Sequence, residues 1–371
     1  QLHSARRFLP ENLAEGMKLF IRGLGLKAIL ANQFGSLWAN VGTIGYESIS
    51  TPLAWLGIYA YSFQIYFDFY GYSLMAAGLG RMLGFKLPIN FMHPYLSTSM
   101  TEFWRRWHIT LGQWFQTYIY IPLGGNRTGT CKWIRNLLVV WILTGMWHGT
   151  EFHFILWGFS LFVIVLTEKL LLKKLTDRYA LAGHLYMAVL IPLSWMLFGI
   201  SDPGSIEVYT RKLFPFFSAD DAIIYVNDFW KNLNDFRFII PAGFLFSTRL
   251  PVRFLKKIRG SVPEIFVYLA IFWASVYCIY TCHRFSGRRS DTTILHRRFP
   301  WSRLRFHPRD PSDDLWGTWL RRSIRQRHQH PHRPDPHRPG SFRHPKYPSP
   351  HPGMHPRLSD QRKSLHLWST T

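Results

Sequence analysis

Charged residues are scarce in this sequence: Asp, Glu, Lys and Arg make up 18% of its 371 residues, against 47% that are hydrophobic. A soluble protein of this length needs more charged surface, so the balance excludes an ordinary cytosolic protein. Cysteine is equally scarce. The three cysteines, Cys131, Cys278 and Cys282, are too few for a disulfide framework, and their spacing lacks the second half of a zinc site. We interpret all three as structural residues.

The scarcity of charge leaves long uncharged stretches within residues 1–280. Each is about as long as the roughly 20 residues that a helix needs to cross a bilayer. Two shorter apolar stretches flank the single acid Glu151 and indicate a broken or re-entrant helix pair. The sequence therefore predicts an all-α polytopic membrane protein. The predicted spans are 28–46, 48–67, 107–126, 179–201 and 265–283, and the broken pair is 137–150 with 152–167.

The first residues carry a different pattern. The sequence opens with Gln1 and shows no signal peptide in its first thirty residues, so we expect it to begin inside a longer protein. Apolar residues recur at helical spacing over 11–30 with charged residues among them. This pattern favours a helix in the membrane interface over a spanning helix.

Proline, arginine and histidine dominate from about residue 281. Residues 281–371 contain 12 of the 23 prolines and 11 of the 17 histidines, and their 19 Lys or Arg against 6 Asp or Glu give a net charge of +13. Such a composition buries too little apolar surface to offset the entropy of ordering, which predicts a disordered tail. Three origins stay open: a basic tail that touches anionic lipid or nucleic acid, a metal-binding tract, and an out-of-frame translation product. The abrupt change after an apolar helix favours the last.

Histidines in the apolar part are the first candidates for chemistry, because an ionisable group inside a membrane is costly. His148 lies in Thr144-Gly-Met-Trp-His-Gly-Thr150, at the break between the two short apolar stretches. Gly145 and Gly149 on either side would let backbone or substrate approach closely. From the residues alone, a hydrogen-bonded structural histidine and a reactive histidine both stay open.

A second histidine, His108, closes the segment Glu102-Phe-Trp-Arg-Arg-Trp-His108. The two Trp-Arg pairs of this segment indicate an anchor in the membrane interface. That interpretation leaves His108 unexplained at the boundary of an apolar stretch, so we expect a polar cavity there. Asp68 follows twenty uncharged residues and must pair or face water. We expect it to be a structural acid bonded to Tyr or Arg.

Three ordered segments resemble the membrane-bound O-acyltransferase family: YFDFYGYSLMAAGLGRMLGFKLPINF, TEFWRRWHITLGQWFQTYIYIPLGGNR and TGMWHGTEFHFILWG. The resemblance runs from about Leu13 to Tyr280. Within the family it is nearest to the bacterial alginate O-acetyltransferase branch, which is related to the teichoic-acid D-alanyl transfer proteins. It implies a multi-pass enzyme of the bacterial inner membrane with a tunnel, where His148 is catalytic and His108 lies near the same tunnel.

The sequence also departs from the family pattern. Gln116 and Thr117 stand where the family commonly has an Arg-Asp pair, and Leu74 stands where an acid often follows the Gly-Tyr-Ser of the first segment. Family members have several helices before the equivalent of Leu13 and an aromatic-rich ending in place of the basic tail. Residues 1–280 would then be a partial transmembrane domain. An active and an inactive chain are both compatible with these departures.

The reaction that the resemblance implies is transfer of an acyl group, expected to be acetyl, from a cytoplasmic thioester such as acetyl-CoA or an acyl carrier protein. The acceptor would be a hydroxyl of an exported polysaccharide or of a periplasmic partner enzyme. His148 would be the general base, because neutral imidazole titrates near operating pH, while His108 or a backbone N–H would stabilise the carbonyl oxygen.

We expect membrane lipid as a further partner, no specific nucleic acid, and neither a bound cofactor nor a metal. The alternative function is a transporter or channel whose pathway is lined by His and Asp, because broken helices with intramembrane polar groups serve that purpose too. No internal repeat of the kind found in many transporters is visible. A scaffold protein is a third possibility, and it would not need a histidine at the helix break.

Overall fold

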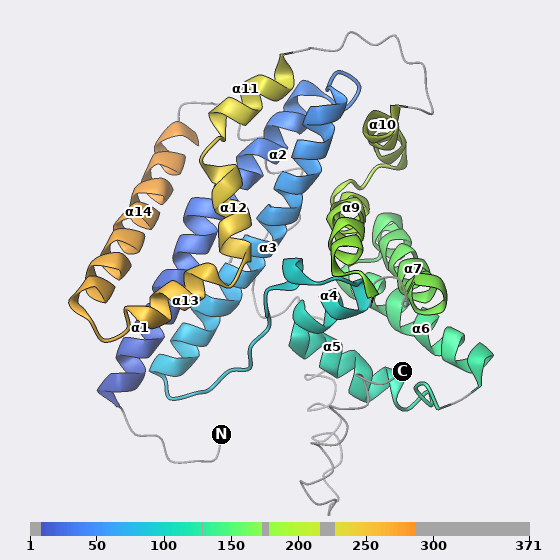
Figure 1. Ribbon diagram of the computed structural model, residues 1–371, viewed down its shortest axis with the longest axis horizontal. Coiled ribbons are helices and arrows are strands. Elements are labelled where there is room, and N and C mark those ends of the chain that lie inside the picture. The colour runs from blue at the N-terminus through green and yellow to red at the C-terminus, as the bar shows by residue number, and fades with distance from the viewer. Residues whose placement is uncertain (1–8, 128, 173–177, 216–226, 287–371) are drawn as a thin grey trace, which may run out of the picture. The chain divides into compact units, whose positions relative to one another are not determined.

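The computed structural model describes residues 9–127, 129–172, 178–215 and 227–286. The chain divides into two units at residue 292, and all described residues lie in the first. The described residues form helices and turns with no strand among them, which confirms the predicted all-α class (Figure 1). The last described helix continues to Ser286, and most of the predicted tail lies outside the described residues.

In chain order the α-helices are α1 (Pro10–Gly25), α2 (Asn32–Ile44), α3 (Thr51–Met82), α4 (Met100–Arg106), α5 (Ile109–Phe115), α6 (Thr130–His148), α7 (Phe152–Thr167), α9 (Ala180–Gly199), α10 (Pro203–Leu213), α11 (Asp228–Asp235), α12 (Ile239–Ser247), α13 (Leu250–Lys257) and α14 (Val262–Ser286). Short π-helical segments continue α1, α5 and α7: Leu26–Ala31, Gln116–Tyr120 and Glu168–Leu172.

Helices α1 and α3 lie side by side in opposite directions (Figure 1). A Cβ added at Gly78 would lie 2.6 Å from the carbonyl oxygen of Gly16, and one added at Gly71 would lie 2.6 Å from that of Gly23. Only glycine permits such a backbone approach. The helix predicted over 11–30 is therefore confirmed, and it packs lengthwise on α3. Its position in a membrane interface stays a prediction.

Buried side chains form two clusters. The larger cluster takes residues from α3, α4, α6, α7 and α9, and Tyr66, Phe103 and Trp157 within it are 1% exposed or less. The smaller cluster lies where α2, α3 and α10 meet, and it includes Tyr209, whose hydroxyl donates to the carbonyl oxygen of Ala54 at 2.7 Å. Every helix that carries a candidate histidine motif is thus packed into one aromatic core.

Three described helical segments are long and apolar enough to cross a membrane: Phe152–Leu172, Ala180–Gly199 and Val262–Thr281. They agree with three of the predicted apolar stretches. The first of them corrects the expectation that 152–167 is too short for a span, because the π-helical segment that follows α7 lengthens it to 21 residues. The helical fold and these segments describe a membrane protein.

The predicted span at 107–126 is wrong as a single helix. The backbone at His108 is left-handed, with φ of 43°, so α4 ends before it and α5 begins after it. Helix α5 and its π-helical continuation have seven and five residues, which gives about 18 Å at 1.5 Å per residue. This length is well short of the roughly 30 Å of a bilayer core.

The predicted helix break after His148 is confirmed. Helix α6 ends at His148, Gly149 and Thr150 are not helical, and α7 begins at Phe152. Helix α6 is longer than the predicted stretch, because it starts at Thr130 and so includes polar residues that a search for uncharged runs leaves out.

Candidate active site

A clamp from the preceding loop fixes the backbone around His108. The carbonyl oxygen of Asn90 accepts from the backbone N–H of Ile109 at 3.1 Å. The side-chain oxygen of Asn90 accepts from the backbone N–H of Thr110 at 3.2 Å and from its hydroxyl at 2.7 Å. A left-handed conformation is unfavourable for a non-glycine residue and persists only where its surroundings enforce it. The hydrogen bonds of Asn90 to Ile109 and Thr110 hold the backbone in this conformation on the C-terminal side of His108.

The residue before His108 is buried in the aromatic core. Trp107 is 4% exposed and its ring lies 4.9 Å from that of Trp195 and 5.0 Å from that of Phe91, centroid to centroid. The interpretation of the Trp-Arg pairs as an interface anchor is therefore wrong for the tryptophans, which pack inside the protein. Arg106 pairs with Glu102 at 2.5 Å one helical turn away. The burial of Trp107 in the core therefore fixes the position of the neighbouring His108.

Helices α6 and α7 form a tight antiparallel hairpin that fixes His148. A Cβ added at Gly145 would lie 3.4 Å from the Cα of Gly158, and one added at Gly158 would lie 3.3 Å from the Cα of Gly145. In both cases a backbone carbonyl oxygen of the facing helix is closer still, that of Phe154 for Gly145 and that of Trp141 for Gly158. The expectation that Gly145 permits close approach is confirmed, and the group that approaches is the backbone of α7.

Aromatic rings surround the His148 imidazole. Its ring centroid lies 5.2 Å from Trp157 and 5.1 Å from Phe198, and both rings stand nearly perpendicular to it. Phe154 lies at 6.2 Å. The Nδ1 atom of His148 is buried and has no hydrogen-bond partner among the described residues. Most buried polar atoms in proteins are paired, so an unpaired imidazole nitrogen is a group available for chemistry.

Trp147 connects the two predicted catalytic histidines. Its ring centroid lies 4.9 Å from that of His148 and 5.9 Å from that of His108. The ring of Phe69, on α3, lies 4.7 Å from His108 on a further side. Both histidines are partly exposed. The structure therefore brings His108 and His148 to one place, from segments about forty residues apart in the sequence.

Glu168 is a buried acid that the sequence analysis missed. It is 3% exposed, and its two carboxylate oxygens accept from the backbone N–H groups of Met100 at 2.5 Å and Thr101 at 3.0 Å. These are free donors at the start of α4, where a carboxylate is favoured by both hydrogen bonding and the helix dipole. The signal was available, because Glu168 directly follows an apolar run, as Asp68 does. Its contacts give it a positioning role for α4.

Asp68 and His153, a further histidine of the apolar part, have contacts of their own. Asp68 pairs with Lys27, and both side chains are about half exposed, so the expected Tyr or Arg partner is replaced by Lys. His153 is buried, with its Nδ1 3.4 Å from a carboxylate oxygen of Glu151. His184 is exposed on α9. No group of three His, Cys, Asp or Glu gathers among the described residues in a way that could hold a metal.

His93, in the loop between α3 and α4, is also left-handed, with φ of 49°. Burial lowers the pKa of its imidazole, and the positive charges of Arg249 and Arg106 act in the same direction. His93 belongs to the loop that also carries Asn90, and we assign it no chemical role.

The chain has helices long enough to span a membrane. At the end of α6, the indole ring of Trp147 contacts the imidazole rings of both His108 and His148. Together these features define a membrane domain with a pair of histidines at a helix break. The family model of the membrane-bound O-acyltransferases matches residues 43–201, a range that contains both histidines, Asn90 and Glu168. Over these residues the chain is similar to the membrane-bound O-acyltransferases. The predicted resemblance is confirmed over the matched residues.

The chain is also similar in sequence to individual acyl-transferring proteins. The chain is 46% identical over 153 residues to a probable alginate O-acetylase, AlgI, of Pseudomonas aeruginosa, covering 41% of this chain and 29% of the relative. It is 45% identical over 147 residues to a peptidoglycan O-acetyltransferase of Helicobacter pylori, covering 40% and 28%. It is 33% identical over 181 residues to a teichoic acid D-alanyltransferase of Streptococcus thermophilus, covering 44% and 42%. The chain thus spans between 28% and 42% of the length of these relatives.

Proposed function

We propose that this chain carries the acyl-transfer site of a bacterial membrane O-acyltransferase. The reaction moves an acyl group, in the first instance acetyl, from a thioester donor to a hydroxyl. The observation that carries the proposal is the meeting of His108 and His148 at Trp147, with the Nδ1 of His148 buried and unpaired among the described residues. The family match over 43–201 and the names of the acyl-transferring relatives support the same class of reaction.

His148 is the general base in this proposal. A hydroxyl is a weak nucleophile at its ordinary pKa, and an imidazole within hydrogen-bond reach can take its proton as the oxygen attacks the thioester carbonyl. The new C–O bond forms while the carbonyl π electrons move to oxygen. When the resulting intermediate collapses, the C–S bond breaks, and the leaving thiolate takes the proton that His148 received. The imidazole returns to its neutral form.

His108 stabilises the carbonyl oxygen as negative charge develops on it. One donor aimed at such an oxygen is typically worth about 3–4 kcal/mol of barrier. Donation requires a fixed ring, and the Asn90 clamp together with the contact to Phe69 holds the imidazole in place. The surrounding tryptophan and phenylalanine rings give this space an apolar lining, which strengthens the interaction of a donor with the developing charge.

The proposal includes a donor and an acceptor. The donor would be a cytoplasmic thioester such as acetyl-CoA or an acylated carrier protein. The acceptor would be a hydroxyl of an exported polysaccharide or of a periplasmic partner enzyme, reached across the bacterial inner membrane. Acetylases of alginate and peptidoglycan among the relatives make a carbohydrate hydroxyl the first acceptor to test.

The test is ester formation in membranes that contain the full chain. Membrane vesicles would receive acetyl-CoA labelled in the acetyl group together with alginate oligosaccharides, and base-labile label on the carbohydrate would be counted. We expect label to accumulate with the natural sequence and to stop in His148→Gln, which keeps hydrogen-bonding capacity but cannot act as a base. His184→Gln is the matched control, because His184 is exposed on α9 and should leave the rate unchanged. Equal rates in both variants would contradict the proposal.

A further inference from the structure

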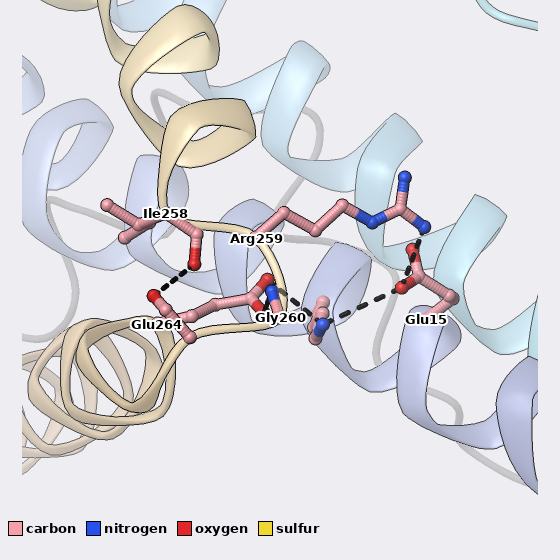
Figure 2. A network of polar contacts seen from close by, with 7 residues as sticks. Glu15, Ile258, Arg259, Gly260 and Glu264 are labelled. Carbon is pink, nitrogen blue, oxygen red and sulfur yellow. Dashed lines mark hydrogen bonds and ion pairs between the residues drawn. The ribbon is translucent and has the colours of Figure 1, made fainter.

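A basic pocket of about 320 Å³ lies far along α3 from the histidines, where α1, the end of α3 and the turn before α14 meet. Its charged lining residues are Glu15, Arg81, Lys86 and Arg259, and its apolar ones are Leu19, Ala77, Phe85 and Leu87. Figure 2 shows the side of this junction where Arg259 reaches toward Glu15. The lining thus combines three cations with one acid on an apolar base.

The acids near this pocket are largely committed to other partners. Glu264 accepts from the backbone N–H of Gly260 at 2.8 Å and pairs with Lys18 at 2.9 Å. Glu15 pairs with Arg259 at 3.2 Å (Figure 2). It also lies 3.6 Å from the ammonium group of Lys18. Among the described residues, no carboxylate lies within ion-pair distance of Arg81. With Glu15 paired to Arg259, the lining acid does not neutralise the positive charge of Arg81.

Exposed apolar side chains surround the pocket. Leu79, Leu83 and Leu87 at the end of α3 and the following turn are 51%, 68% and 49% exposed. The apolar helix α14 begins at Val262, three residues after Arg259, and its Ile265 and Phe266 are 61% and 67% exposed. Exposed leucine and phenylalanine beside arginine and lysine are typical of the boundary between lipid tails and headgroups.

Helix α13 has the same combination of exposed apolar and basic side chains. It is short and carries exposed Leu250 and Phe254 together with the exposed cations Arg253, Lys256 and Lys257. A helix that exposes both apolar and basic side chains is stable where one side contacts acyl chains and the other contacts charged headgroups. Because α13 leads into Arg259, a helix of this composition lies next to the pocket in the chain.

We propose that this pocket binds the phosphate headgroup of an anionic phospholipid, with Arg81 and Arg259 contacting the phosphate and an acyl chain lying against Leu19 and Leu87. The pocket holds positive charge, which a zwitterionic headgroup matches less well than an anionic one. Its apolar base and the exposed leucines beside it have no counterpart in a small soluble anion, whereas a phospholipid supplies both charge and apolar length.

The experiment uses the purified full chain in a non-ionic detergent, with dioctanoyl phosphatidylglycerol as the probe and microscale thermophoresis as the readout. Dioctanoyl phosphatidylcholine and inorganic phosphate are the two comparison ligands. We expect phosphatidylglycerol to bind at least about fivefold more tightly than either, since each basic side chain near anionic lipid contributes about 1 kcal/mol. Equal binding of inorganic phosphate would overturn the proposal in favour of a soluble anion, and equal binding of phosphatidylcholine would overturn the role of charge.

Matched variants separate the pocket from the general positive charge of the chain. Arg81→Gln should weaken phosphatidylglycerol binding about fivefold. Arg253→Gln removes the same charge from α13 outside the pocket lining and should leave binding nearly unchanged. Arg81→Lys should retain most of the affinity, and the melting temperatures of all three proteins should agree. Equal weakening by Arg81→Gln and Arg253→Gln, or a loss in Arg81→Lys as large as that in Arg81→Gln, would overturn the site.

Discussion

Two parts of the molecule are held together in contrasting ways. Helices α1 and α3 meet through glycines that let their backbones touch. Helix α4 instead packs against α6, α7 and α9 through aromatic rings, with Trp104 5.2 Å from Trp141, 5.8 Å from Trp157 and 6.2 Å from Trp195. Within the described residues, the aromatic part also contains buried polar atoms with no hydrogen-bond partner, among them the indole nitrogens of Trp104 and Trp157 and the Nδ1 of His148.

The difference separates a structural interface from a candidate site. Backbone contact at glycine gives close packing and leaves no side chain free for chemistry. Leaving a polar atom unpaired in a buried site costs about 1–3 kcal/mol, so such atoms persist where function requires them. We therefore expect substitutions in the glycine interface to change stability, and substitutions at the paired histidines to change acyl transfer.

The largest expected stability effect is at the glycine interface. A Cβ at Gly23 would lie 2.8 Å from the backbone nitrogen of Met75, so Gly23→Ala forces α1 away from α3. We expect the free energy of unfolding in detergent to fall by about 3 kcal/mol. Gly42→Ala is the matched control, since a Cβ there meets nothing within 4 Å, and it should be neutral or raise stability by up to about 1 kcal/mol. Equal losses of stability in both variants would contradict the claim that α1 and α3 need glycine at their contact.

At His108 the expected effect is on activity. Asparagine can still donate a hydrogen bond and adopts left-handed backbone more readily than leucine does. His108→Asn should therefore retain measurable acyl transfer, whereas His108→Leu should lose about a hundredfold. Initial rates of ester formation in membrane vesicles, normalised to the amount of protein, make this comparison. If asparagine and leucine cost the same, His108 has no hydrogen-bonding role in the reaction.

A smaller effect is expected at Glu168, which belongs to the aromatic part but has a structural role. Glu168→Gln replaces a carboxylate that accepts two backbone N–H groups by a neutral amide. The free energy of unfolding should fall by about 2 kcal/mol, the usual value for hydrogen bonds to a charged group. Glu207→Gln, in an exposed ion pair with Arg211, should change it by less than about 0.5 kcal/mol. An equal response of both acids would mean that the α4 cap contributes nothing.

The sequence predicted the apolar spans at α9 and α14 because an uncharged run of about twenty residues is a local property. It also located both histidines and the helix break after His148. It could not predict that α1 packs lengthwise on α3, because the contacts of Gly16 with Gly78 and of Gly23 with Gly71 depend on residues far apart in the chain.

The same reason explains the errors around His108. Nothing local to that segment signals a left-handed residue, because the clamp that enforces it comes from Asn90. The uncharged run at 107–126 therefore predicts one spanning helix, and this prediction is wrong. The tryptophans of the motif resembled an interface anchor in composition, and only their tertiary contacts reveal that Trp107 is part of the core.

The central claim is that His148 serves the reaction and not the fold. One variant tests it, His148→Ala, with the rate of ester formation and the melting temperature measured on the same preparation. We predict that the rate falls by at least about a hundredfold, as expected when a general base is removed, while the melting temperature changes by no more than about 2 °C. Retained acyl transfer, or a large loss of stability in the same preparation, would contradict this account.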